Sequence, residues 1–214
     1  MNRKMWLLSV LGAISAFLFC SFLGVLNSGA APSQRQEIAR LAELMEWKPG
    51  TIVADIGAGD GSYSFAAAEI VGPTGRVYAT EIDTDKLKQL RTDVLKRKLA
   101  NVIVVEGAVD DTKLPSECCD AIYLRHVYHH LTQPEEFDRN LVRSLKIGAR
   151  LAIIDFPANE NLPPVEGVPK NRGGHGIPQE VVVEELTSAG LQVEKVVGDW
   201  SRNDYCVLFV KRGP

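Results

Sequence analysis

The sequence predicts an α/β fold, in which a mainly parallel sheet is covered by helices on both faces. Short apolar segments alternate along the chain with longer segments of helical periodicity, and a glycine-rich turn follows the first apolar segment. The chain has 214 residues, of which 45% are hydrophobic. This size and composition fit one globular domain with a short appendage.

The individual elements follow from apolar spacing and from residues that begin or end helices. Strands are predicted at residues 51–55, 76–80, 102–105, 121–124, 150–155, 192–197 and 205–211. Helices are predicted at residues 33–47, 62–71, 84–99, 134–146 and 178–190. Ser33 and Thr84 are expected to cap two of these helices, and Leu95 is expected to face inward. Glu37 is expected on the solvent-exposed face of the first helix.

The N-terminal segment differs in character from the rest of the chain. Residues 5–26 carry no charged side chain, and Arg3 and Lys4 precede them. About 20 apolar residues span a bilayer as a helix, whereas the apolar run of a signal peptide is shorter. We therefore expect residues 1–32 to form an uncleaved membrane anchor with its linker, with a cleaved signal peptide as the alternative. Residues 33–214 are expected to form the domain.

Composition excludes several classes of function. The formal net charge is -3 at pH 7, and no long basic run is present, so the sequence does not predict nucleic-acid binding. The four cysteines include no CxxC pair, so neither a zinc site nor a redox motif is expected, and no metal is predicted. Cys118 and Cys119 are neighbours, which is poor geometry for a disulfide between them, and free thiols are expected.

A glycine-rich loop carries the first functional signal. It reads Asp55-Ile56-Gly57-Ala58-Gly59-Asp60-Gly61 and joins the first predicted strand to a helix. Glycines permit positive φ angles and let a ligand approach the backbone closely. The spacing is Gly-x-Gly-x-Gly, which differs from the dinucleotide-binding Gly-x-Gly-x-x-Gly pattern. The carboxylates of Asp55 and Asp60 would repel a pyrophosphate but suit a cationic ligand, such as a sulfonium with an α-amino group.

A second carboxylate follows the second predicted strand. Glu81 stands at its end, where an acidic side chain can accept hydrogen bonds from both hydroxyls of a ribose. The loop, the strand before it and Glu81 together predict a site for an adenosyl ligand.

At this point the sequence resembles the class I S-adenosylmethionine-dependent methyltransferases over residues 34–211. Residues 53–61 are similar to that family's first motif, residues 80–83 to its ribose-binding motif, residues 120–131 to its fourth motif, and residues 145–155 to the segment around its fifth strand. The small-molecule branch of the family is the nearest. The resemblance implies a Rossmann-like, doubly wound sheet of seven strands, mostly parallel, with one antiparallel strand near the C-terminus.

The resemblance also implies a set of residues that bind S-adenosylmethionine. The predicted set is Asp55, Gly57, Ala58, Gly59, Gly61, Glu81, Ile82, Ala108, Val109, Asp110 and Arg125. One departure concerns the adenine, because Ala108 follows Gly107 where the family often has an acidic residue. Asp110, Asp111 or the backbone of Ala108 is expected to replace it.

Histidines are the candidates for acid–base chemistry at the acceptor. His129 and His130 lie in the segment that faces the methyl group in this family, and His175 lies in a glycine-rich loop that can cover the pocket. Imidazole titrates near neutrality, so each is a candidate general base. For each, a purely structural or solvent-exposed role is the alternative.

The predicted function is methyl transfer from S-adenosylmethionine to a small-molecule acceptor. The alternatives are a non-catalytic, membrane-tethered module that binds an adenosyl ligand and, less favoured, a nicotinamide-dependent oxidoreductase. Positive charge before residue 5 predicts an exported domain, yet the cofactor is made in the cytosol. The domain is therefore expected to be cytosolic, to be supplied by a transporter, or to have given up the cofactor.

Overall fold

The computed structural model describes residues 33–213. The predicted anchor or signal segment, residues 5–26, lies outside this range. Among the described residues, no helix has the length and apolar character needed to cross a membrane.

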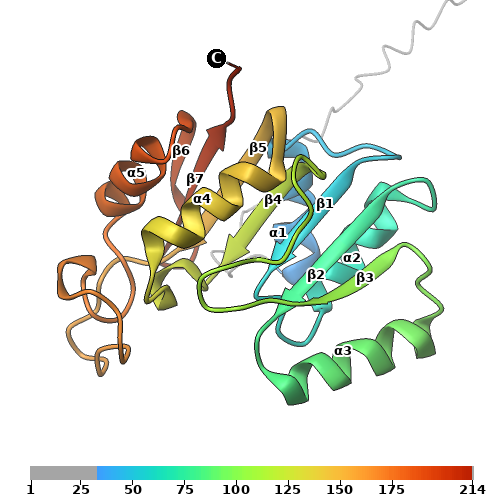
Figure 1. Ribbon diagram of the computed structural model, residues 1–214, viewed down its shortest axis with the longest axis horizontal. Coiled ribbons are helices and arrows are strands. Elements are labelled where there is room, and N and C mark those ends of the chain that lie inside the picture. Colours follow the sequence, from blue (N-terminus) through green and yellow to red (C-terminus); the bar gives the residue numbers. More distant parts are fainter. Residues whose placement is uncertain (1–32, 214) are drawn as a thin grey trace, which may run out of the picture. The chain divides into compact units, whose positions relative to one another are not determined.

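One sheet of seven strands forms the centre of the domain, in the order β3-β2-β1-β4-β5-β7-β6 (Figure 1). The strands are β1 (Ile52–Ile56), β2 (Arg76–Glu81), β3 (Val102–Glu106), β4 (Cys119–Arg125), β5 (Leu145–Asp155), β6 (Gln192–Ser201) and β7 (Asp204–Val210). The pairs β1–β2, β1–β4, β2–β3 and β4–β5 are parallel, whereas β7 runs antiparallel to β5 and β6. The predicted sheet, mostly parallel with one antiparallel strand near the C-terminus, is confirmed.

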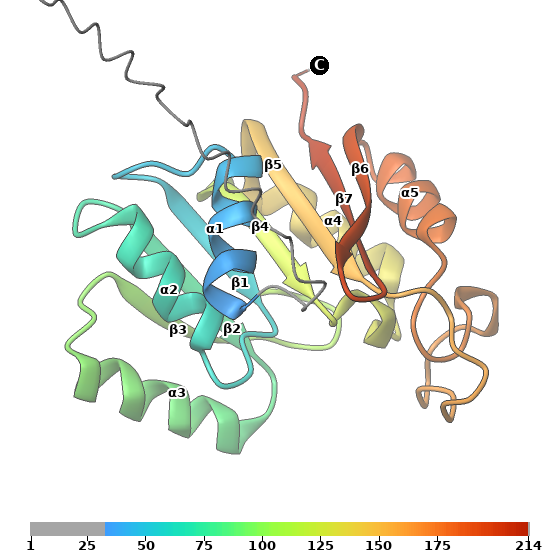
Figure 2. The ribbon, with the colours of Figure 1, turned by 180° about the vertical axis from the view of Figure 1, so that it is seen from behind.

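Helices cover both faces of this sheet, as Figures 1 and 2 show from opposite sides. They are α1 (Gln34–Leu44), α2 (Ser62–Val71), α3 (Thr84–Arg97), α4 (Pro134–Ser144) and α5 (Gln179–Ser188). Apolar residues of α1, α2 and α3 pack in one buried cluster with Val53 of β1, and those of α4 and α5 pack in a second cluster with Ala54. The side chains of these two neighbouring residues of β1 therefore lie on opposite faces of the sheet, as strand geometry requires.

The N-terminal caps of α1 and α3 can be compared with those predicted from the sequence. Ser33 caps α1 as predicted: its hydroxyl accepts the Gln36 backbone N–H, and the Gln36 side chain accepts the Ser33 N–H. The predicted cap of α3 is wrong by one residue. The Asp83 carboxylate, not the Thr84 hydroxyl, accepts the first backbone N–H groups of this helix, at 2.9 and 3.0 Å. A carboxylate there also interacts favourably with the helix dipole.

The inward orientation predicted for Leu95 is wrong, because its side chain is 78% exposed. Leu87 and Leu90 are buried on α3, and a residue five positions beyond Leu90 is turned by about 140° around the helix axis. The expectation of free thiols at Cys118 and Cys119 is also wrong. The structure joins their sulfur atoms in a disulfide at the start of β4, where the pairing register shifts.

A buried carboxyl on α4 makes the stability of the fold depend on pH. Asp138 accepts a hydrogen bond from the Tyr128 hydroxyl at 2.9 Å, and its Oδ1 has no partner among residues 33–213. Burial raises the pKa of this carboxyl to about 7, and the nearby charge of Glu185 acts in the same direction. The folded protein therefore holds this proton more tightly than the unfolded chain does, and the contribution to stability is lost as pH rises from about 4 to 7.

We predict that Asp138→Asn is more stable than the wild type at pH 8, by up to about 4 kcal/mol, and that this advantage shrinks toward pH 4. An amide keeps the hydrogen bond from Tyr128 without burying a charge. Denaturant unfolding at several pH values measures the difference. Asp199→Asn, at an exposed position, controls for the loss of one negative charge. A constant difference between Asp138→Asn and the wild type at every pH would contradict the prediction.

Candidate active site

A cavity of about 610 Å³ opens at the carboxyl ends of β1, β2 and β4. This is the edge of a parallel sheet at which ligands bind in doubly wound folds. Its wall includes nine of the residues singled out in the sequence: Gly57, Gly59, Glu81, Ile82, Ala108, Val109, Asp111, Arg125 and His130. The other six lie outside this wall: Asp55, Ala58, Gly61, Asp110, His129 and His175.

The three glycines of the loop have positive φ angles for different reasons. Gly57 has a φ of +72°, and a Cβ there would lie 2.5 Å from the Val127 side chain. Gly61 has a φ of +78° at the start of α2, and a Cβ there would lie 2.5 Å from both Leu90 and Phe65. Gly59 has a φ of +58°, and its nearest neighbour is a backbone oxygen at 4.0 Å. Gly57 and Gly61 are therefore required by packing, whereas Gly59 leaves open space at the cavity.

The two aspartates of the loop are not part of the cavity wall, and each accepts hydrogen bonds from a serine of α2. Asp55 is buried and accepts a hydrogen bond from the Ser64 hydroxyl at 2.6 Å, and burial raises its pKa to about 6. Asp60 accepts the Ser62 backbone N–H and hydroxyl, at 2.9 and 2.6 Å, and these bonds lower its pKa. Ala58 is likewise buried, and its backbone N–H donates to the Thr80 carbonyl.

Glu81 is held by backbone N–H groups on two sides. Its Oε1 accepts the N–H groups of Ile82 and Asp83, at 2.8 and 3.1 Å, and its Oε2 accepts the Gly59 N–H at 3.0 Å. The side chain is 6% exposed, so these contacts fix its orientation. A carboxylate oxygen accepts about two hydrogen bonds, so Oε2 retains capacity for one donor from the cavity. Oε2 is therefore the oxygen of Glu81 that we expect to accept a hydrogen bond from a ribose diol.

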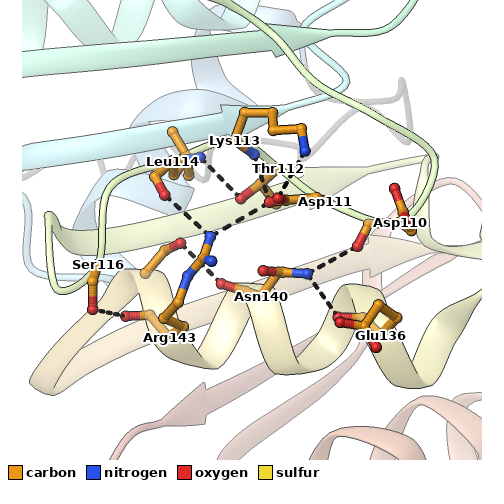
Figure 3. A network of polar contacts seen from close by, with 10 residues as sticks. Asp110, Asp111, Thr112, Lys113, Leu114, Ser116, Glu136, Asn140 and Arg143 are labelled. Atoms are coloured by element: carbon orange, nitrogen blue, oxygen red, sulfur yellow. Dashed lines mark hydrogen bonds and ion pairs between the residues drawn. The ribbon is translucent and has the colours of Figure 1, made fainter.

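The loop after β3 forms another part of the wall and is anchored to α4 (Figure 3). Arg143 donates to the Asp111 carboxylate and to the Leu114 carbonyl, and Asn140 donates to the Asp110 carbonyl at 3.0 Å. The Ala108 N–H is used within the loop, where it donates to the Asp111 carbonyl at 2.7 Å. Of the acidic residues considered for the adenine, Asp111 borders the cavity and Asp110 does not.

The end of β4 is connected to α1 by a buried carboxylate. Glu37 accepts hydrogen bonds from Arg125 Nε at 2.8 Å and from Trp200 Nε1 at 3.0 Å, although burial opposes its charge. The expectation that Glu37 faces solvent is wrong, because Arg125 and Trp200, both distant in sequence, bind its carboxylate and the side chain is buried. His126, next to Arg125, also borders the cavity. Its backbone is in the left-handed conformation, with a φ of +55°, and its Nε2 lies 2.8 Å from the Asp204 carboxylate.

His126 was not selected from the sequence, although it stands in the same histidine-rich segment. Other residues of the wall that were missed are Lys86, Thr112 and Phe137. Each comes from a helix or loop whose distance to the cavity depends on tertiary packing. In the sequence, these residues are marked only by their position, either just after a predicted strand or near the start of the helix that follows a strand.

The three candidate histidines occupy different positions. His129 is 2% exposed, and its Nδ1 lies 2.8 Å from the Asp155 carboxylate at the end of β5. His130 borders the cavity. His175 lies in the loop of residues 156–178, drawn in orange in Figure 1, and its Nδ1 lies 2.8 Å from the Pro163 carbonyl.

A buried arginine attaches that loop to the rest of the domain. Arg172 is 1% exposed and donates to the carbonyls of Leu131 and Tyr128, at 2.9 and 3.0 Å, and to both carboxylate oxygens of Glu185, at 2.8 and 3.1 Å. The bidentate pair with Glu185 has the geometry that guanidinium groups favour. Arg172 therefore fixes residues 156–178 against the turn that carries His129 and His130.

Known proteins share both the sequence motifs and the fold. Residues 54–153 match the family described as a methyltransferase domain. The chain is 33% identical over 115 residues to the ubiquinone/menaquinone biosynthesis C-methyltransferase UbiE of Ectopseudomonas mendocina, covering 53% of this chain and 45% of that protein. The chain thus spans about half the length of the curated relatives that it matches.

Two solved structures extend the likeness to the whole fold. One is a SAM-dependent methyltransferase from Aquifex aeolicus, at 28% identity and a TM-score of 0.69, covering 83% of this chain and 93% of that one. The other is the cyclase SpnF, at 15% identity and a TM-score of 0.69, covering 84% of this chain and 82% of that one. The second likeness concerns the fold alone, and shows that this fold carries more than one chemistry.

The fold, the glycine loop and the family match over residues 54–153 are similar to those of class I S-adenosylmethionine-dependent methyltransferases. These comparisons support the enzyme class predicted from the sequence.

We predict that Gly61→Ala lowers the free energy of unfolding by about 2–4 kcal/mol, because the new Cβ adds a clash with Leu90 and Phe65 to the strain of a positive φ. Gly190→Ala is the control, since Gly190 also has a positive φ just beyond the end of a helix, here α5, and has open space around it. It should cost about 1 kcal/mol. Denaturant unfolding measures both, and equal losses would show that packing at Gly61 has no effect.

We predict that Arg172→Lys loosens residues 156–178, because one ammonium cannot replace four hydrogen bonds to three groups. The free energy of unfolding should fall by about 1–3 kcal/mol, and limited proteolysis within residues 157–171 should become at least about tenfold faster. Arg139→Lys, which changes an exposed arginine paired with Glu136, is the control and should leave both measurements nearly unchanged. Protection of the loop equal to that of the wild type would refute this role of Arg172.

Proposed function

We propose that this protein transfers the methyl group of S-adenosylmethionine to a small-molecule acceptor. The observation that carries the proposal is the placement of Glu81. Its carboxylate stands between the glycine loop and the cavity, with its orientation fixed by three backbone N–H groups and with one acceptor site left on Oε2. A carboxylate so held suits a ribose hydroxyl, and its charge opposes a phosphate at the same place.

The other walls of the cavity fit the rest of that ligand. Ile82 and Val109 are 57% and 50% exposed, and both border the cavity. Large apolar side chains that remain exposed beside a cavity favour the faces of a flat ring such as a purine. Gly59 leaves the space in which a ligand can approach the backbone. When bound, S-adenosylmethionine supplies a methyl group on a positively charged sulfur, which makes that methyl electrophilic.

The residues of this chain would align the acceptor and exclude water. The loop of residues 156–178, fixed by Arg172, stands beside the histidines of the turn after β4. Alignment of two reactants in a closed site contributes a large part of the rate of such a displacement. The curated relatives act in ubiquinone and menaquinone biosynthesis by name, which supports a small-molecule acceptor here.

A binding module without turnover is the second candidate. The departure at Ala108 favours it, because the family often has an acidic residue for the adenine at this position. Binding of S-adenosylmethionine without methylation of any acceptor in a metabolite extract would favour this second function. Transfer of labelled methyl to an extract component would decide for the first.

We predict that Glu81→Gln weakens binding of S-adenosylmethionine about 10- to 100-fold, because a charged hydrogen bond to the ligand and the carboxylate that orders the glycine loop are both lost. Glu106→Gln is the matched control: Glu106 pairs with Glu81 in the register of β3 with β2, yet lies outside the cavity wall. Titration calorimetry measures both affinities, and thermal unfolding checks that each variant is folded. No binding by the wild type, or equal binding by Glu81→Gln, would falsify the proposal.

A further inference from the structure

A disulfide joins two adjacent residues, Cys118 and Cys119, where β4 begins. Cys119 is fully buried, whereas Cys118 is partly exposed at the surface of the domain. A small reagent in solvent therefore meets this bond from the side of Cys118. Cys206 of β7, by contrast, is a buried free thiol.

This disulfide contributes little to the stability of the fold. A cross-link stabilises a protein mainly by restricting its unfolded chain, and the effect grows with the length of the loop that is closed. A bond between adjacent residues closes the shortest loop possible. The strand that follows is held instead by its pairing with β1 on one side and β5 on the other. The role left to such a bond is chemical, because a pair of thiols can be oxidised and reduced reversibly.

The disulfide stands at an irregular point of the sheet. Cys119 pairs with Leu145 of β5. Two residues farther along β4, Ala121 pairs with Arg150, so the register shifts between these points. Because regular pairing is interrupted here, the backbone of residues 117–119 can change its torsion angles without breaking the regular ladder that follows.

Arg143 of α4 connects this segment to the wall of the cavity (Figure 3). Its carbonyl oxygen accepts the backbone N–H of Glu117, the residue before Cys118, at 2.9 Å. Its guanidinium donates to the Asp111 carboxylate and to the Leu114 carbonyl, at 3.4 and 3.3 Å. Asp111 borders the cavity. A single side chain and its own carbonyl thus join the disulfide segment to the cavity wall.

We propose that Cys118 and Cys119 form a redox-modification site, at which a thiol reductant opens the disulfide and loosens the loop of residues 107–118 that borders the cavity. The pair itself is the element with two states. With the bond formed, the backbone at the start of β4 is held in one conformation, and Arg143 carries this order to Asp111. With the bond broken, that restraint is lost. The effect on cofactor binding rests on the proposed function, whereas the redox chemistry does not.

The co-reactant is a low-molecular-weight thiol or dithiol, and the exchange balances with it. A thiolate of the reductant attacks one sulfur of the pair, the S–S bond breaks, and a mixed disulfide forms. A second thiolate of the reductant attacks the reductant's sulfur in that mixed disulfide and releases the cysteine. The reductant leaves as a disulfide, and the pair gains two electrons and two protons. Because the cytosol reduces disulfides and exported proteins keep them, the state of the pair depends on the compartment.

The first test maps the thiols of the full chain. The protein is equilibrated with oxidised glutathione, denatured, blocked with N-ethylmaleimide and digested with trypsin. The peptide of residues 114–125 carries both cysteines, and mass spectrometry should find it without maleimide and lighter by two hydrogen atoms than its reduced form. Dithiothreitol added before blocking should give a peptide with two maleimides. Two maleimides without reductant, a glutathione adduct, or a bond from this peptide to Cys20 or Cys206 would overturn the proposal.

The second test compares the oxidised and reduced protein. Reduction with dithiothreitol should speed amide hydrogen exchange in residues 107–118 by at least about tenfold and leave that of β1 unchanged. It should also weaken binding of S-adenosylmethionine, measured by calorimetry, by about 5- to 20-fold. Reoxidation should restore both values.

Two variants separate the disulfide from other effects of the reductant. Cys118→Ser cannot form the bond, so it should behave like the reduced wild type both with and without dithiothreitol. Cys206→Ala, which removes the buried thiol of β7, is the control and should keep the full response. Thermal unfolding checks that each variant is folded. A response to dithiothreitol that persists in Cys118→Ser would show that another group is responsible.

The outcomes also separate this inference from the proposed function. If the wild type does not bind S-adenosylmethionine in either state, the proposed function fails, and hydrogen exchange in residues 107–118 still decides the redox inference. If it binds S-adenosylmethionine equally in both states, the proposed function survives and the coupling of the disulfide to the cavity is overturned.

Discussion

The backbone pairing of β1 with β2 on one side and with β4 on the other determines where the site can form. These parallel ladders place the ends of three strands at one edge, so the glycine loop, Glu81 and Arg125 meet although they are far apart in sequence. The contact between the Gly59 N–H and the Glu81 carboxylate exists only because β1 and β2 end together. The later contacts of the site, from the loop after β3 to the histidines, are arranged around this edge.

Much of this edge follows from sequence alone, because strand ends and glycine spacing are local features. The strands, the glycine loop and Glu81 are each predicted from residues within a few positions of one another. Contacts that depend on tertiary packing are not predicted in this way. Glu37 was expected to face solvent, since nothing near it in sequence announces Arg125 or Trp200 as its partners. Asp55 was expected to contact ligand, but the alternation of β1 directs it to Ser64 on α2.

The histidines also illustrate that contacts made by tertiary packing are not predicted from local sequence. Their crowding after β4 is visible in the sequence. Which ring is buried and which borders the cavity depends on Asp155 from β5 and on the loop that bears His175. His126 borders the cavity but is not predicted from the sequence, because its left-handed backbone and its contact with Asp204 of β7 arise only in the folded chain.

One guanidinium group, that of Arg172, holds the loop of residues 156–178 against the rest of the domain. Arg172 bonds two carbonyls and a carboxylate at once, and separating it from them leaves several buried polar groups without partners together. Opening is then all-or-none rather than gradual, and each 1.4 kcal/mol in the contact changes the open fraction about tenfold. Because Arg172 bonds the carbonyls of Tyr128 and Leu131, which flank His129 and His130, each opening of the loop also frees the turn that carries these two histidines.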